Sequence, residues 1–122
     1  MPVSEETYLQ LVVEDPEGHW ELDCGRLRSK PGMTVPHNDI AWFVGHWLQS
    51  QLNPQEFRVR VDAGRLRRTA ATYYEPDVMV IPAAVMHRRR AEAPAAVEAY
   101  SEPLPLVVEV WSPWTGEYDV GN

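Results

Sequence analysis

The chain has 122 residues, a formal net charge of −7 and 44% hydrophobic residues, which is typical of one globular domain. No apolar stretch approaches the roughly 20 residues that a membrane-spanning helix needs, and the acidic start at Glu5 and Glu6 is unlike a signal peptide. The single cysteine, Cys24, excludes an internal disulfide, so we expect a cytoplasmic protein.

The charges are distributed unevenly along the chain. All eleven Lys and Arg residues fall between positions 26 and 90, and the segments on either side carry only acidic charges. The arginines from Arg58 to Arg68 could therefore form a basic face that binds phosphate groups. They could equally be the solvated face of a hairpin, and the sequence leaves both interpretations open.

The first third of the chain predicts a helix and a hairpin. Ser4, followed by two acidic residues, is typical of a helix N-cap and predicts a helix over residues 5–13. Residues 20–22 and 26–28 are strand-like segments on either side of the turn sequence Asp-Cys-Gly at 23–25. This arrangement predicts a short β-hairpin.

A longer helix is predicted after the loop that contains Pro31 and Pro36. It begins at His37 or Asn38 and ends at about Leu52. Its apolar residues follow helical spacing, which predicts one buried stripe along the helix. The stripe consists of Ile40, Phe43, Val44, Trp47 and Leu48.

Several strands are predicted in the second half of the chain. Residues 57–61 alternate between apolar side chains and arginine, as a half-buried strand does. The turn that follows leads into residues 66–68, which we expect to be the hairpin partner of that strand. Residues 77–81 predict another strand, whereas residues 83–100 predict a loop with at most a short helix.

The closing segment is an apolar run, Leu106 to Trp111, that contains one carboxylate, Glu109. Its length and β-branched content predict a strand that is buried on both faces. An ionised carboxylate in such a strand is destabilising unless a cation, a metal or hydrogen-bond donors receive it. We therefore expect Glu109 to belong to a functional site.

The order of these elements is helix, hairpin, helix and then several strands. It predicts an α+β fold with a central mixed β-sheet flanked by helices. No internal repeat or linker divides the sequence, so we expect residues 1–122 to form a single domain.

Two carboxylates, Asp77 and Glu109, each lie in a strand-like apolar segment. If the two strands are neighbours, both side chains can point to one place and bind Mg²⁺ or Mn²⁺, which prefer oxygen ligands and accept a phosphate oxygen. From the residues alone, one carboxylate could instead cap a strand while the other pairs with an arginine.

Several motifs together resemble those of a known family. The segments EPDVMVIP at 75–82 and PLVVEVWSPWT at 105–115, followed by Tyr-Asp at 118–119, resemble the Uma-type restriction endonucleases. These enzymes are a bacterial branch of the PD-(D/E)XK nuclease superfamily. WELDCGRL at 20–27 is similar to the hairpin of that family, and His37 matches its histidine at the start of the long helix. The resemblance covers nearly the whole chain.

The resemblance implies a restriction-endonuclease-like core and hydrolysis of DNA phosphodiester bonds that depends on Mg²⁺ or Mn²⁺. Asp77 and Glu109 would be the catalytic residues and metal ligands, and the backbone carbonyl of Val110 would be a third ligand. Three further residues fall at accessory positions of the site: Glu21, His37 and Asp119.

The resemblance also implies a catalytic lysine. In the superfamily this lysine normally lies two residues after the glutamate, where this chain has Trp111; in the Uma-type branch it follows shortly after the position of Asp119. The sequence reaches Asn122 before such a lysine, so we expect a chain truncated at its C-terminus, with very weak or absent cleavage activity.

Two further expectations follow from that truncation. The alternative function is a catalytically inactive nuclease-fold domain that binds nucleic acid or another protein. Apolar surface left uncovered, at Val107, Trp111 and Trp114, would favour a homodimer or a higher oligomer.

Overall fold

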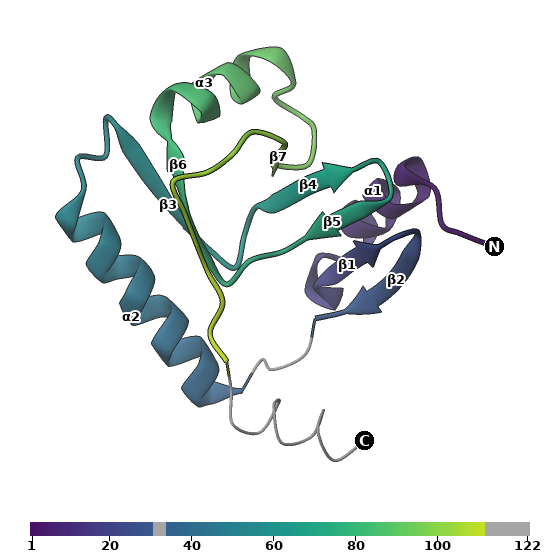
Figure 1. The fold of residues 1–122 in the computed structure, drawn as a ribbon, viewed down its shortest axis with the longest axis horizontal. Helices are drawn as coiled ribbons and strands as arrows, with labels where there is room; N and C mark the ends of the chain where they lie inside the picture. Colours follow the sequence, from purple (N-terminus) through teal and green to yellow (C-terminus); the bar gives the residue numbers. More distant parts are fainter. Residues whose placement is uncertain (31–33, 112–122) are drawn as a thin grey trace.

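The computed structural model describes residues 1–30 and 34–111. Within these ranges the chain forms an α+β fold, which confirms the predicted class (Figure 1). The elements in chain order are α1 (Glu5–Glu14), the 3-10 helix η1 (Pro16–Gly18), β1 (Trp20–Asp23), β2 (Arg26–Ser29), α2 (Val35–Gln51), β3 (Phe57–Val61), β4 (Arg65–Thr69), β5 (Thr72–Tyr74), β6 (Val78–Pro82), α3 (Ala83–Glu92), β7 (Ala99–Tyr100) and β8 (Leu106–Val108). None of the described helices has the length and apolar character that a membrane crossing requires.

The strands are divided between two sheets. One has the strand order β2-β1-β5-β4-β7, and the other has the order β3-β6-β8. Strands β4 and β7 run parallel, whereas the other pairs are antiparallel, so the strand arrangement is mixed as predicted. The chain passes from the first sheet to the second between β5 and β6.

Helix α1 and the first hairpin form where the sequence predicts them. The Ser4 side chain accepts a hydrogen bond from the Thr7 amide at 3.1 Å, which caps α1. Between β1 and β2, Cys24 and Gly25 both have positive φ angles, 49° and 82°, as a two-residue hairpin turn requires. Helix α1 then buries Tyr8 against the five-stranded sheet.

Helix α2 begins earlier than predicted, because Pro36 lies in its first turn rather than in a loop. Proline is compatible with that position, since the first amides of a helix have no partner within the helix. Thr34 is the N-cap and accepts a hydrogen bond from the His37 amide at 3.3 Å.

The predicted buried stripe of α2 is wrong. Ile40, Phe43 and Trp47 are 50%, 63% and 60% exposed. The buried positions are His37 and two small residues, Ala41 and Gly45. A Cβ atom added at Gly45 would come within 2.2 Å of Val61 Cγ2, so α2 approaches β3 through its small side chains and leaves its large ones outside.

The predicted hairpin between residues 57–61 and 66–68 is also wrong. Strand β3 pairs with β6, in a register that runs from Phe57–Pro82 to Val61–Val78. Strand β4 instead joins β5 and β7 in the other sheet. The chain turns away after β3 at Asp62, which has a φ angle of 52°.

The last third of the chain differs from prediction in two places. Residues 83–92 form a full helix, α3, whose Met86 packs on the buried strand β6. Strand β8 pairs with β6 at the edge of its sheet, and its Leu106 and Val107 are 41% and 39% exposed. The prediction of a closing strand buried on both faces is therefore wrong.

Candidate functional site

The site is built around Asp77, which immediately precedes β6 in the segment that links the two sheets. Its side chain is almost fully buried, with 1% exposure. The Asp77 carbonyl accepts a hydrogen bond from the Asp62 amide at 2.8 Å, and its Oδ2 accepts one from the Val110 amide at 2.6 Å. Asp77, just before β6, is thereby bonded on one side to the residue that follows β3 and on the other side to the segment that follows β8.

Lys30, at the end of the first hairpin, brings the two predicted carboxylates together. Its Nζ lies 2.7 Å from Asp77 Oδ1 and 3.5 Å from Glu109 Oε2. It also donates a hydrogen bond to the Glu75 carbonyl. The Lys30 side chain is 8% exposed and Asp77 is 1% exposed, whereas Glu109 is 58% exposed. The buried ammonium therefore pairs with one buried carboxylate and with one that faces solvent, so the expected burial of Glu109 is wrong.

Sequence reasoning missed Lys30, although one signal was present. Lys30 is the only lysine in the sequence, and the family resemblance implied a catalytic lysine. That lysine was expected only after Glu109, whereas the structure places Lys30, from about 80 positions upstream, 3.5 Å from Glu109 Oε2.

His37 and Glu21 occupy different sides of this cluster. His37 lies in the first turn of α2, with 4% exposure, and its Nε2 is 3.1 Å from Asp77 Oδ1. Glu21 is buried in β1, where its Oε2 accepts a hydrogen bond from the Glu75 amide at 2.7 Å and its Oε1 pairs with Arg28 at 3.1 Å. Glu21 therefore holds the backbone of the linking segment.

The charges of the cluster depend on one another. Burial raises the pKa of Asp77, but Lys30 and the Val110 amide outweigh that effect and hold it below its ordinary value. Burial likewise favours the neutral amine of Lys30, yet contact with Asp77 and the charge of Glu109 raise the pKa of Lys30. Desolvation and the neighbouring Asp77 raise the pKa of Glu109 to about 7, although Lys30 opposes them.

The cluster has the properties of a cation site. Two carboxylates from different strand ends converge on one positive charge. Lys30 and His37 both approach Asp77 Oδ1, yet neither contact has the alignment of a hydrogen bond, so this buried oxygen keeps unused acceptor capacity. The carboxylate oxygens of Asp77 and Glu109 are the kind of ligand that a divalent ion such as Mg²⁺ prefers.

The residues predicted for the site are therefore largely brought together. Glu109 and His37 lie close to Asp77 and Lys30, and Glu21 supports the segment before Asp77. For Val110, whose carbonyl was predicted as a ligand, the contact with Asp77 is made by the amide. Asp119 lies outside the described residues.

A second group of potential metal ligands lies behind the linking segment. Among the residues that the structure describes, His19, Asp62 and Glu75 form the one trio of such side chains whose ligand atoms lie within 4.8 Å of one another. Glu75 is 3% exposed and contacts His19 Nδ1 at 2.7 Å and Arg65 at 2.8 Å. This group is an alternative position for a metal ion.

The arginines expected to bind phosphate groups are largely used inside the protein. Arg60 pairs with Glu98 at 2.9 Å, Arg65 with Glu75 at 2.8 Å, and Arg67 with Glu5 at 2.6 Å. These three arginines join elements that are distant along the chain, whereas Arg58 donates to the nearby Pro54 carbonyl at 2.7 Å and Arg68 is exposed.

Comparisons with known proteins place this geometry in context. A family model described as "Uma2: Putative restriction endonuclease" matches residues 5–122. The fold is similar to the crystal structure of "a putative nuclease belonging to DUF820 from Anabaena variabilis ATCC 29413", with a TM-score of 0.72 and 19% sequence identity. The similarity covers 98% of this chain and 64% of that one, so this chain spans less than two thirds of that protein. No curated protein matches the sequence.

Proposed function

Since the chain belongs to the Uma2 restriction endonuclease family, we propose that it is a nuclease that hydrolyses DNA phosphodiester bonds with a divalent metal ion. The observation that carries this proposal is the convergence of Asp77 and Glu109 on one buried cation, the Lys30 ammonium. A geometry that holds an ammonium between two carboxylates also suits Mg²⁺ or Mn²⁺.

The metal ligands in this proposal are Asp77 Oδ1, the Glu109 carboxylate and the Val110 carbonyl. A metal ion bound there would supply Lewis acidity towards a phosphate oxygen and a lowered pKa for a bound water. The residues of the chain do the rest. The Val110 amide fixes the orientation of Asp77, and the buried His37 lies 3.1 Å from Asp77 Oδ1 on the helix side.

In this proposal Lys30 has the role of the superfamily's lysine. Its raised pKa keeps the ammonium charged, so it can stabilise the negative charge that develops on a phosphate during hydrolysis. The expectation of very weak activity was based on a lysine sought only after Asp119. With Lys30 in the site, we expect this chain to cleave DNA.

One observation favours the alternative of a catalytically inactive domain that binds nucleic acid or protein. Lys30 Nζ lies 2.7 Å from Asp77 Oδ1, at the oxygen that a metal ion would use. A lysine that never leaves this oxygen would exclude the metal, because two cations cannot share the position.

Titration with Mn²⁺ and a DNA cleavage assay on the same protein test these proposals. We expect saturable Mn²⁺ binding and Mn²⁺-dependent nicking of plasmid DNA, both lost in Asp77→Asn and in Glu109→Gln. The matched control is Asp62→Asn, which alters the second group of ligands and should retain cleavage. Undiminished cleavage by Asp77→Asn would overturn the nuclease assignment at this site.

The same assay separates the alternatives. Saturable binding that is lost in Asp62→Asn but kept in Asp77→Asn would place the metal at His19, Asp62 and Glu75. A folded wild-type chain without Mn²⁺ binding or cleavage would support the inactive domain instead.

A further inference from the structure

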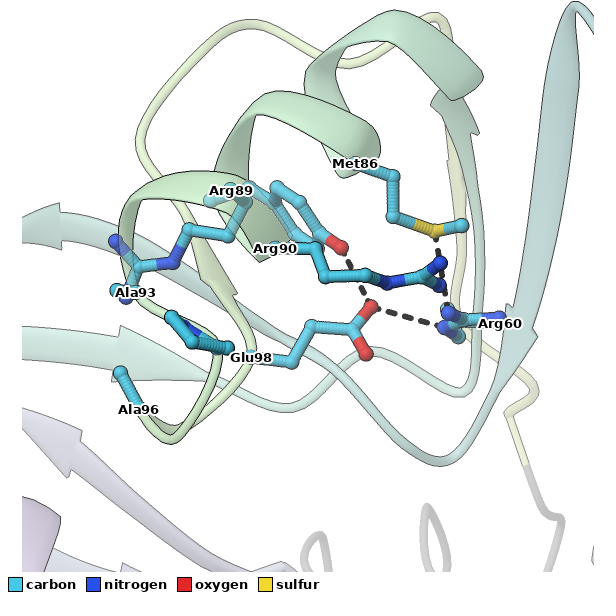
Figure 2. A pocket seen from close by; sticks show the side chains of 9 residues that line it. Arg60, Met86, Arg89, Arg90, Ala93, Ala96 and Glu98 are labelled. Atoms are coloured by element: carbon cyan, nitrogen blue, oxygen red, sulfur yellow. Dashed lines mark hydrogen bonds and ion pairs between the residues drawn. The ribbon is translucent and has the colours of Figure 1, made fainter.

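A small pocket lies between α3, β3 and the segment that leads into β7. Figure 2 shows it from close by, with Arg60, Arg89 and Arg90 among the side chains that line it. Its volume is about 150 Å³, and it shares no lining residue with the Asp77 site. The metal-binding proposal makes no use of this pocket.

The guanidinium groups in the pocket are poorly supplied with acceptors. Arg60 donates through Nε to Glu98 Oε2 at 2.9 Å, but its Nη2 contacts only the Met86 sulfur, at 3.1 Å. A thioether sulfur is a weak acceptor. Arg89, at the opposite end of the pocket in Figure 2, donates through Nη2 to the Val97 carbonyl at 3.3 Å. A buried donor without a good acceptor is destabilising, so Arg60 retains capacity to bind a further acceptor.

The charge in the pocket is also unbalanced. Three arginines and one carboxylate, Glu98, line the pocket, and that carboxylate already accepts from Arg60 and from the Tyr100 hydroxyl at 2.6 Å. Within residues 1–30 and 34–111, no carboxylate pairs with Arg89 or Arg90, although their neighbour Arg88 pairs with Glu102 at 2.7 Å. In Figure 2 the Arg90 side chain extends along the pocket towards the end where Arg60 lies.

We propose that this pocket binds a phosphate monoester group through Arg60 and Arg90, whose side chains extend towards the same end of it in Figure 2. A dianion supplies both the missing acceptors and the missing charge, and arginine binds phosphate oxygens through paired N–H donors. The volume of about 150 Å³ is roughly that of five water molecules, far below the about 300–1,000 Å³ of sites that enclose a whole drug-sized ligand. Only the phosphate group itself is therefore enclosed.

Calorimetric titration with inorganic phosphate, in buffer without divalent metal, tests this proposal. We expect saturable binding that weakens about tenfold or more in Arg90→Ala, because the variant removes charge-assisted hydrogen bonds to the phosphate oxygens. The matched control is Arg88→Ala, which removes a guanidinium from the same helix outside the pocket and should bind phosphate as the wild type does. Equal loss in Arg88→Ala, or no binding by the wild type, would overturn the proposal.

Glu98→Gln provides a second test that does not depend on loss of binding. Removing the competing carboxylate should tighten phosphate binding. If the arginines serve only to pair with Glu98, the substitution should not increase the affinity for phosphate. Unchanged or weaker binding by folded Glu98→Gln would count against the site.

The source of the phosphate group is resolved by three probes: adenosine monophosphate, a 5′-phosphorylated oligonucleotide and the same oligonucleotide with a 5′-hydroxyl. Preference for the phosphorylated oligonucleotide, lost in Arg90→Ala, would identify nucleic-acid ends as the ligand. Equal binding of adenosine monophosphate and inorganic phosphate would identify a free phosphate compound. Binding of all three probes irrespective of Arg90 would refute the pocket as their site.

Discussion

At the scale of single residues, the ion pair between Lys30 and Asp77 determines the electrostatics of the site. Both side chains are nearly inaccessible, with 8% and 1% exposure. The depressed pKa of Asp77 and the raised pKa of Lys30 show that each charge stabilises the other. Their pairing therefore contributes stability at neutral pH, which is lost at low pH as Asp77 is protonated and at high pH as Lys30 is deprotonated.

We predict that Lys30→Met destabilises the protein by about 3 kcal/mol at pH 7, since it leaves the Asp77 charge buried without its partner. Lys30→Arg, which keeps the charge, should cost less. Urea unfolding followed by circular dichroism measures both variants. The stability lost in Lys30→Met should shrink as the pH falls through the folded-state pKa of Asp77, and a constant loss at all pH values would contradict this account.

A second residue-scale prediction concerns Tyr73, whose hydroxyl donates to Glu5 at 2.6 Å. Burial and the Glu5 carboxylate raise the pKa of Tyr73 from 10.0 to about 12. Since the folded state favours the neutral phenol, this contribution to stability is complete below pH 10 and is lost as the pH rises towards 12. Between pH 9 and 12 the free energy of unfolding should therefore decrease by about 2 kcal/mol less in Tyr73→Phe than in the wild type, as measured by urea unfolding. An identical alkaline slope in both proteins would refute it.

At the scale of elements, α2 shows how backbone proximity decides which face of a helix is buried. The helix packs on β3 through Ala41 and Gly45, and this close approach places the buried His37 beside Asp77. A larger residue on this face would move the helix away from the sheet and shift His37 with it.

We predict that Gly45→Ala destabilises the protein by about 1–3 kcal/mol, despite the better helix propensity of alanine, because its Cβ would meet Val61. The control is Ser50→Ala on the exposed face of the same helix, which should change stability by less than about 0.5 kcal/mol. Thermal and urea unfolding measure the difference. A stabilised Gly45→Ala would contradict this account, because it would show that the space between α2 and β3 accommodates a Cβ atom.

At the scale of the whole molecule, the candidate site lies where the two sheets meet. Lys30 comes from the end of the five-stranded sheet, Asp77 from the segment between the sheets, and Glu109 from the segment after β8. The distances between these three side chains therefore depend on how the two sheets pack against each other.

The exposed apolar surface gives a prediction at the same scale. Val107 on the edge strand β8 is 39% exposed, and Trp111 is 73% exposed. Unpaired strand edges with apolar side chains favour association with a second chain. We predict a homodimer at micromolar concentration by light scattering, with a shift towards monomer in Val107→Lys. A monomeric wild type would contradict the prediction.

Local patterns in the sequence predicted those parts of the fold that depend on neighbouring residues. The cap at Ser4 and the turn at Cys24 and Gly25 formed as predicted, because a capping side chain and a positive φ angle are local requirements. The motifs around Asp77 and Glu109 likewise identified the family.

The tertiary structure alone decided the rest. No local pattern shows that β3 pairs with β6, that α2 buries its small residues, or that β8 is an exposed edge, since each depends on contacts between distant segments. The partner of Glu109 was undecidable for the same reason. The sequence by itself indicated Asp77 and Glu109 as candidate ligands, and only the folded chain showed that Lys30, contributed by the first hairpin, contacts both of them.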